Sequence, residues 1–366
     1  AIWVWRGWRL QVTELDLYGN AGGLAFPGAQ VRALLGWAAI TAASFGFGLG
    51  AERGLRFQFR AGSGARWGAA FLVGQVVLAL GVLFVGLVGL LVPGLWALTL
   101  GGIALLALLA RGEREQTGQK GQAGFWPAAF GALCAVGLGL SFVLALAPVE
   151  ESDGVRYHAF AVQEYLKAGA IIHLPYHAFT NLPFQTHMLF TAGAAISGEL
   201  RAAQLVHWAY LPALALFAGL LARTVLLEVL ARRREVSALA VGTWSFAAGT
   251  VAALTPVGLV IAGWPNVDLS TATYTLAAMW ALAPGSLRRE RHRFAMAGIF
   301  AGAAVGTKLT ALISSALLGV VVLAVLVLFK KWRAFAWFTI PAALVCAPWF
   351  VRNAVIHGNP VYPAAY

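Results

Sequence analysis

The chain has 366 residues, of which 60% are hydrophobic and only 11% are charged, and its formal net charge is +12. Soluble domains carry about 25% charged residues, so this composition excludes a soluble globular domain and predicts a polytopic membrane protein. The positive charge lies in short loops between apolar runs, which is typical of cytoplasmic loops rather than of a nucleic-acid-binding surface. The two cysteines, Cys134 and Cys346, lie in separate apolar segments and predict neither a disulfide framework nor a metal pair.

The apolar segments predict an all-α bundle of about ten transmembrane helices, because a spanning helix needs about 20 mostly apolar residues. In chain order the predicted spans are 31–49, 68–91, 94–110, 124–146, 202–230, 236–262, 267–283, 294–306, 309–329 and 334–350. Residues 1–30 mix tryptophan with arginine and predict an interfacial segment. Residues 186–198 are too short to cross comfortably and favour a re-entrant or shallow helix, with a short span as the alternative. Pro93-Gly94 predicts the turn between the second and third spans.

The basic clusters fall on one side of this predicted topology, which would be the cytoplasmic side. They are Arg53 to Arg66, Arg232 to Arg234, Arg288 to Arg293, and Lys330 to Arg333. The opposite side receives an outer loop, 147–185, together with Asp268, Lys308 and Arg352. Ionisable groups near a membrane are costly and usually mark a pathway or a site. The sequence therefore predicts one extracytoplasmic pocket built from distant parts of the chain.

The outer loop begins with three carboxyl groups in four residues, Glu150, Glu151 and Asp153. An apolar stripe at helical spacing follows, which predicts an amphipathic helix at the membrane interface. Ser152 or Asp153 is placed to cap this helix, and a purely structural reading of the acids is slightly favoured on composition alone. The functional reading is a general base, a metal ligand or both.

Three further residues carry open alternatives. Asp268 stands at the start of an apolar helix, where the helix dipole alone is a sufficient reason for an acid. Lys308, in the segment GTKLT, either extends its ammonium group to the interface or binds a phosphate as a point charge. Arg352 is predicted on the side where positive charge is disfavoured, and an anionic ligand is the simplest reason for it.

Other patterns carry less functional information. His173 and His177 flank Pro175, so a metal site with His187 is less favoured than ordinary loop hydrogen bonding. Gly298, Gly302 and Gly306 form a stripe of small residues that predicts close helix packing. No Walker motif is present, so an inner-face nucleotide site is not supported.

Five motifs occur in an order that carries a resemblance to a known family. They are EESDGVRYHAFAVQEYLKAGAI, NLPFQTHMLFTAGAAISGELRAAQLVH, NVDLSTATYTLAA, GTKLTAL and PWFVRNAVIHGNPVYP. In this set the chain resembles the GT-C superfamily of polytopic membrane glycosyltransferases, in the group that uses polyprenyl-phosphate sugars and is related to the mannosyltransferases. The resemblance covers residues 124–366, and it implies a GT-C-like core there whose later part lies beyond the given sequence. Residues 1–123 form a separate N-terminal unit of an interfacial segment and about three helices.

The resemblance implies roles for individual residues. Asp153 matches the catalytic carboxylate of the first outer loop, and Asp268 matches the second acid at a later helix start. Lys308 and Arg352 are the candidates for holding the lipid phosphate. The remaining substrate-binding candidates lie in the same motifs and are Glu151, Tyr157, His158, Asn181, Gln185 and Asn353. The superfamily often shows paired acids, whereas Ser152 and Gly154 flank Asp153 here, so a divalent cation (Mg²⁺ or Mn²⁺) is left open as a cofactor and no metal ligand is assigned.

The predicted function is transfer of a sugar from a polyprenyl-phosphate donor to an acceptor hydroxyl, on the outer side of the cell (inner or plasma) membrane. The predicted partners are the lipid-linked sugar, membrane lipids and, in a complex, other membrane subunits, but not nucleic acid. The first alternative is a non-catalytic GT-C-like subunit of a larger membrane complex. A transporter ranks third, because no internal repeat is found in the sequence.

Overall fold

The computed structural model describes residues 25–57, 59, 62–110, 124–230, 237–283 and 286–364, and these residues contain no β-strand. The predicted all-α fold is confirmed. The helices are α2 (Ala25–Leu55), α3 (Gly62–Leu87), α4 (Leu91–Ala110), α5 (Phe125–Ala145), η1 (Gly154–Ala159), α6 (Phe160–Ala168), η2 (Ala178–Asn181), α7 (Gln185–Ser197), α8 (Arg201–Trp208), α9 (Tyr210–Leu230), α10 (Ala238–Ala253), α11 (Pro256–Ala262), α12 (Asp268–Leu282), α13 (Glu290–Thr307), α14 (Ala311–Leu328), η3 (Trp332–Phe335) and α15 (Ala336–His357).

Seven helices in the described part of the chain are long and apolar enough to cross a membrane, or eight if α10 and α11, bent by 62°, count as one span. This supports a membrane protein, although the predicted count of about ten spans is not confirmed. The difference comes from α12, which has only 15 residues, and from α13, which begins with the charged residues 290, 291 and 293. Both helices nevertheless pack side by side in the middle of the bundle.

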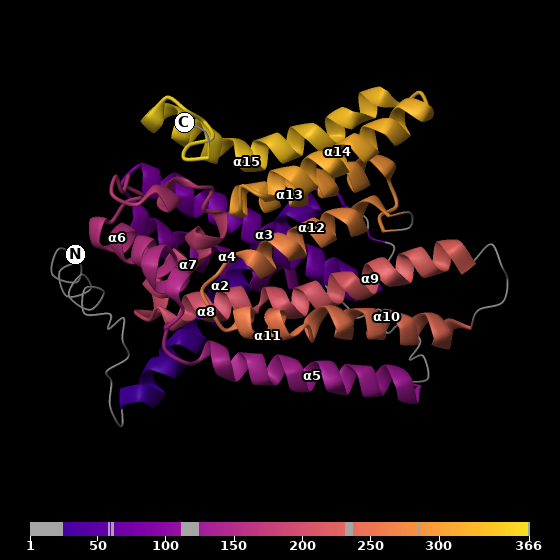
Figure 1. Ribbon diagram of the computed structural model, residues 1–366, viewed down its shortest axis with the longest axis horizontal. Helices are drawn as coiled ribbons and strands as arrows, with labels where there is room; N and C mark the ends of the chain where they lie inside the picture. The colour runs from indigo at the N-terminus through magenta and orange to yellow at the C-terminus, as the bar shows by residue number, and fades with distance from the viewer. Residues whose placement is uncertain are drawn as a thin grey trace.

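Figure 1 shows the long helices running roughly parallel, with two distinct ends. The short elements α6, α7 and α8 gather at one end, together with the last turn of α15. The last turn of α9 and the first turn of α10 lie at the opposite end. Because the helices alternate in direction, the first turn of α12 and the last turn of α13 also fall at the α6–α8 end. The polar residues predicted on one side therefore share one end of the molecule.

Two local predictions differ from the structure. The turn between α3 and α4 is formed by residues 88–90, where Gly89 has a φ of +76°, and not by Pro93-Gly94. Pro93 lies in the first turn of α4, where its missing N–H costs nothing. The segment predicted as a re-entrant or shallow helix is α7, which has 13 residues, nearly all buried, and packs against α2, α3 and α8 inside the bundle.

Close helix contacts at glycines hold the bundle together. A Cβ atom at Gly298 or Gly302 would overlap the backbone carbonyl of Phe338 or Ala342 of α15, and one at Gly306 would meet Gln185 and Trp349. The predicted packing role of this stripe is confirmed. The same device joins α2, α3 and α4, where Gly74 lies against the carbonyl of Ser44.

The predictions for the N-terminal segment and two basic loops concern parts of the chain outside the described residues. These parts are 1–24, 111–123 and 231–236. The division into units at residue 123 stays a prediction, and α2 packs directly against α7 and α8.

Candidate functional site

The first part of the candidate site is the loop that enters η1. Glu151 accepts hydrogen bonds from the backbone N–H groups of Asp153 (2.9 Å) and Gly154 (2.5 Å). Glu151 thus caps the helix, and the prediction that Ser152 or Asp153 does so is wrong, since neither side chain makes a capping hydrogen bond. The reason is that Glu151 lies just before the helix, so its carboxylate reaches the free N–H groups of Asp153 and Gly154. The carboxylate of Asp153 is left exposed and available.

The predicted amphipathic helix is confirmed as η1 followed by α6, but its apolar stripe is covered by protein. Ala159, Val162 and Leu166 are buried in a hydrophobic cluster that includes residues of α7. The stripe therefore docks the helix onto the bundle. Its first part is a π-helical segment, Gly154–Ala159, which follows directly on Asp153.

The second part of the site is the loop before α12, and it lies against the first. A Cβ atom at Gly154 would come within 3.1 Å of Pro265. The loop is fixed by His207, whose Nδ1 donates to the carbonyl of Trp264 (2.8 Å) while its Nε2 accepts from the N–H of Leu269 (3.3 Å). His207 was not among the predicted site residues. Its position within an apolar stretch was the available signal.

The third part is an ion pair between Asp268 and Lys308. The Lys308 Nζ lies 2.6 Å from Asp268 Oδ1, and both side chains are partly exposed. The N-terminal turn of α7 links α12 and α13, since Thr186 hydrogen-bonds to Ser270 of α12 (3.1 Å) and to Thr307 of α13 (3.3 Å). Two residues singled out for different reasons in the sequence are therefore direct partners.

Tyr157 lies among the carboxylates of both loops. Burial raises its pKa to about 12, and the negative charges of Asp153, Asp268 and Glu151 contribute in that order. The loops that carry the two predicted catalytic acids lie against each other at Gly154 and Pro265. The other face of Tyr157 packs near Phe179, with ring centroids 5.5 Å apart.

The residue after Tyr157, His158, forms a buried pair of imidazoles with His187 of α7. His158 and His187 are each 1% exposed, and the Nδ1 of His158 shares a hydrogen bond with the Nε2 of His187. Burial lowers the pKa of His158 to about 3, with further lowering from His207 and Lys308, and burial also lowers the pKa of His187. Both rings are therefore neutral, and His187 pairs with His158 and stacks on Phe184.

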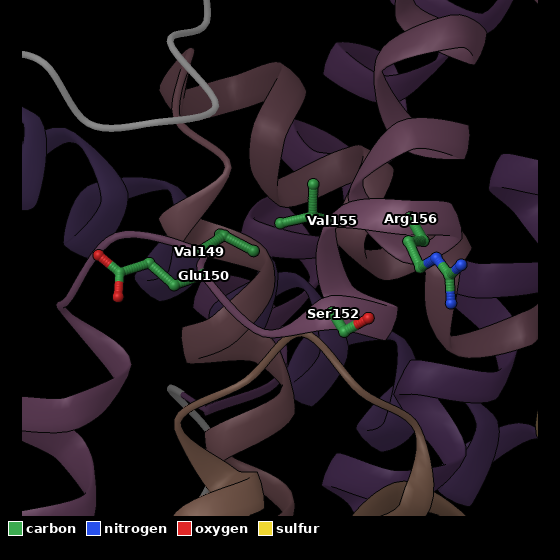
Figure 2. Close-up of a pocket in the computed structure, with 5 residues that line it drawn as sticks. All are labelled: Val149, Glu150, Ser152, Val155 and Arg156. Atoms are coloured by element: carbon green, nitrogen blue, oxygen red, sulfur yellow. The ribbon is translucent and has the colours of Figure 1, made fainter.

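A surface hollow of about 680 Å³ opens at the start of η1. It is lined by Val149, Glu150, Ser152, Val155 and Arg156. Figure 2 shows the Glu150 carboxylate and the Arg156 guanidinium at opposite sides of it, pointing away from each other. The hollow is thus bordered by one acidic and one basic side chain, and Asp153 is not among its lining residues.

Four of the predicted binding residues take no part in the Asp268–Lys308 ion pair. They are Asn181, Gln185, Arg352 and Asn353. Gln185 is buried where α7 meets Gly306, close to the buried Tyr274. Arg352 and Asn353 lie at the end of α15, where Asn353 donates to the carbonyl of Asn181 at 2.7 Å. The eight predicted binding residues therefore divide into four sets: Glu151, Tyr157 and His158 near η1, Lys308 in the ion pair, the buried Gln185, and Asn181, Arg352 and Asn353 at the end of α15.

No three histidine, cysteine or carboxylate side chains in the described residues are grouped so that they could hold a metal ion. Glu151 is used as a cap and Asp268 is paired with Lys308. These donors do not fit a preformed divalent-cation site, so no step below is routed through a metal.

Comparison with known proteins gives one match. Residues 207–366 match the model of a family described as a domain of unknown function, DUF8201. No curated protein and no solved structure matches the chain. The matched region covers less than half of the chain and contains Asp268, Lys308 and Arg352, while Asp153 lies outside it.

Proposed function

We propose that the protein is a membrane glycosyltransferase. It moves a sugar from a polyprenyl-phosphate donor to an acceptor hydroxyl, at the end of the bundle that holds η1 and the Asp268–Lys308 pair. This end faces the extracytoplasmic side of the cell membrane, opposite the basic loops. The observation that carries the proposal is the contact between the η1 loop, where Asp153 is exposed, and the loop before α12, whose Asp268 is paired with Lys308. The reaction needs a free acid and a cation, and this end of the bundle carries both.

Asp153 is the general base. Its carboxylate takes the proton from the acceptor hydroxyl as the oxygen attacks the anomeric carbon. The bond between that carbon and the phosphate oxygen breaks with inversion, and the electron pair leaves with the polyprenyl phosphate. Glu151 does not act as a second base, because its two oxygens accept the N–H groups at the start of η1. Glu151 instead fixes the backbone that carries Asp153.

Lys308 neutralises the leaving phosphate. Its ammonium has three N–H donors, and one of them faces Asp268, which leaves two for phosphate oxygens. Asp268 acts as the group that orients Lys308. His207 in turn holds the loop that leads to Asp268. Arg352 has different surroundings and takes no part in this step.

The test uses cells from which the gene has been deleted, because such a test works without knowing the sugar or the acceptor. Loss of the chain should cause its own lipid-linked donor to accumulate, as measured by mass spectrometry of the lipid extract. Wild-type protein should restore the normal level, and Asp153→Asn should fail to do so. Glu164→Gln is the control, since Glu164 is a surface acid of α6 paired with Lys167. Full restoration by Asp153→Asn would rule the proposal out.

A non-catalytic subunit of a membrane complex is the second candidate. It is favoured by the fact that Glu151, Asp268 and Lys308 already satisfy one another or the backbone, as purely structural groups would. In that case no polyprenyl-phosphate sugar would accumulate in the deleted cells. Another membrane protein would instead lose its stability or its partner, which native gel electrophoresis of the membranes would detect.

A further inference from the structure

The last turns of α15 contain a buried arginine without a counter-ion. Arg352 is only 7% exposed. Its Nη1 lies 3.5 Å from the Oδ1 of Asn353, and its Nη2 has no hydrogen-bond partner. None of the carboxylates in the described residues forms an ion pair with it. A buried charge is strongly destabilising unless it is paired, so this position favours the binding of an anion.

The surroundings of Arg352 form a frame of fixed polar groups. Asn353 donates to the backbone carbonyls of Asn181 (2.7 Å) and Tyr362 (2.9 Å). The Oδ1 of Asn181 is 3.2 Å from a ring nitrogen of both His173 and His357. These bonds tie the end of α15 to the loop after α6. The frame holds the guanidinium in place and contributes imidazole groups, but no negative charge.

Tyr165 of α6 is buried and does not balance the charge of Arg352. Burial raises the pKa of Tyr165, and the positive charge of Arg352 opposes the rise. The phenol therefore stays neutral. The surroundings of Arg352 also differ from those of Lys308, whose charge is balanced by Asp268.

Apolar side chains are exposed next to Arg352 on α15. Val351, Val355 and Ile356 are 58%, 80% and 40% exposed. Ile356 is one helical turn beyond Arg352 on the same face, and Val355 stands beside it. A ligand that satisfies both features has an anionic head for the guanidinium and an apolar chain for the helix surface. That combination describes a membrane lipid better than a free ion.

We propose that Arg352 binds the phosphate group of an anionic membrane lipid, at a site separate from the Asp268–Lys308 pair. The planar guanidinium presents paired N–H donors that match phosphate oxygens, and Nη2 is the unused one. The site is independent of sugar transfer, because it is built from different residues and requires no reaction.

The test compares thermal unfolding of delipidated protein in a neutral detergent. Wild type, Arg352→Gln and Arg333→Gln are each measured alone, with phosphatidylglycerol, with phosphatidylcholine and with inorganic phosphate. Arg333 is an exposed arginine at the opposite end of the same helical segment and gives the same change of charge. Phosphatidylglycerol should raise the unfolding midpoint of wild type and of Arg333→Gln, while phosphatidylcholine should not. In Arg352→Gln the rise should be lost.

The effect of Arg352→Gln on the unfolding temperature should change sign when phosphatidylglycerol is added. Without lipid, Arg352→Gln removes an unbalanced buried charge and should unfold at the same temperature as wild type or higher. With phosphatidylglycerol it should unfold at a lower temperature than wild type. An equal response of wild type and Arg352→Gln to phosphatidylglycerol would overturn the proposal. A response to inorganic phosphate of the same size would keep the phosphate site but overturn the lipid as its source.

Binding is also counted directly by native mass spectrometry, which does not depend on the midpoint. Apparent affinity for phosphatidylglycerol should fall about tenfold or more in Arg352→Gln, as expected for lost charge-assisted hydrogen bonds. If that variant does not fold, Arg352→Lys keeps the charge without the paired donors and should bind more weakly than wild type. Equal binding by Arg352→Lys would contradict the guanidinium site. Exclusive binding of polyprenyl phosphate would assign Arg352 to the proposed donor and would also overturn a separate lipid site.

Discussion

Lys308 and Asp268 are direct partners across 40 residues of sequence, with Nζ and Oδ1 2.6 Å apart. The pair joins the end of α13 to the start of α12, at the end of the bundle where η1 begins. It is partly exposed, so its value to stability is small, about 0–1 kcal/mol for surface ion pairs. In the proposed reaction its ammonium group has a second use, which is to stabilise the charge of the leaving phosphate.

Neutralising the pair separates these two uses. Lys308→Met should change the free energy of unfolding by about 1 kcal/mol or less and should reduce donor consumption about a hundredfold or more. The double variant Asp268→Asn/Lys308→Met should be equally inactive, because the phosphate still lacks its cation. Recovery of activity in the double variant would indicate that the pair only balances its own charges.

The two acids of the η1 loop should respond in opposite ways. Glu151→Ala removes the helix cap and should lower the free energy of unfolding by about 0.5–2 kcal/mol. Asp153→Asn leaves all capping bonds in place and should lower only transfer, about a hundredfold or more. Thermal unfolding and lipid mass spectrometry of the two variants measure the two effects. A Glu151→Ala protein as stable as wild type would contradict the assigned cap.

The His158–His187 pair should make stability depend on pH. In the folded state the pKa of His158 is lowered to about 3 and that of His187 is also lowered, so both stay neutral while the unfolded chain takes up protons below about pH 6.5. Stability is therefore fully present above about pH 6.5 and is lost as the pH falls toward 3, by about 1.4 kcal/mol per pH unit for each ring. Reversible unfolding between pH 7.5 and 5 should show this slope. The slope should flatten in His158→Gln/His187→Gln, and an unchanged slope in that variant would refute the assignment.

The close approach of α13 and α15 predicts the cost of larger residues at the glycine stripe. Gly302→Leu would push its side chain into the backbone of Ala342 and should cost at least about 1–3 kcal/mol. Gly101→Leu is the matched control, because nothing lies within 4 Å of a Cβ atom at that exposed position. Chemical denaturation of both variants in detergent should separate them clearly. Similar stability would mean that the helices can move apart freely.

Much of the architecture could be predicted from sequence because it depends on local properties. Apolar length predicted α2, α5, α14 and α15, and the spacing of small residues predicted the α13 contact. The gathering of polar residues at one end follows from the alternation of helix direction. Segment length also predicted the bounds of α12, a 15-residue helix, but its burial among neighbouring helices is not visible in its own hydropathy.

The sequence by itself determined the class of molecule and the candidate site residues, because hydropathy and charge are local properties of consecutive residues. Only the tertiary structure decided how those residues pair. It made Glu151 the cap and left Asp153 free, joined Asp268 to Lys308, set His158 against His187, and isolated Arg352 without a carboxylate. The physical reason is that pairing depends on which helix ends meet. The contacts between helix ends depend on packing between elements far apart in the chain, and this packing cannot be predicted from a local sequence pattern.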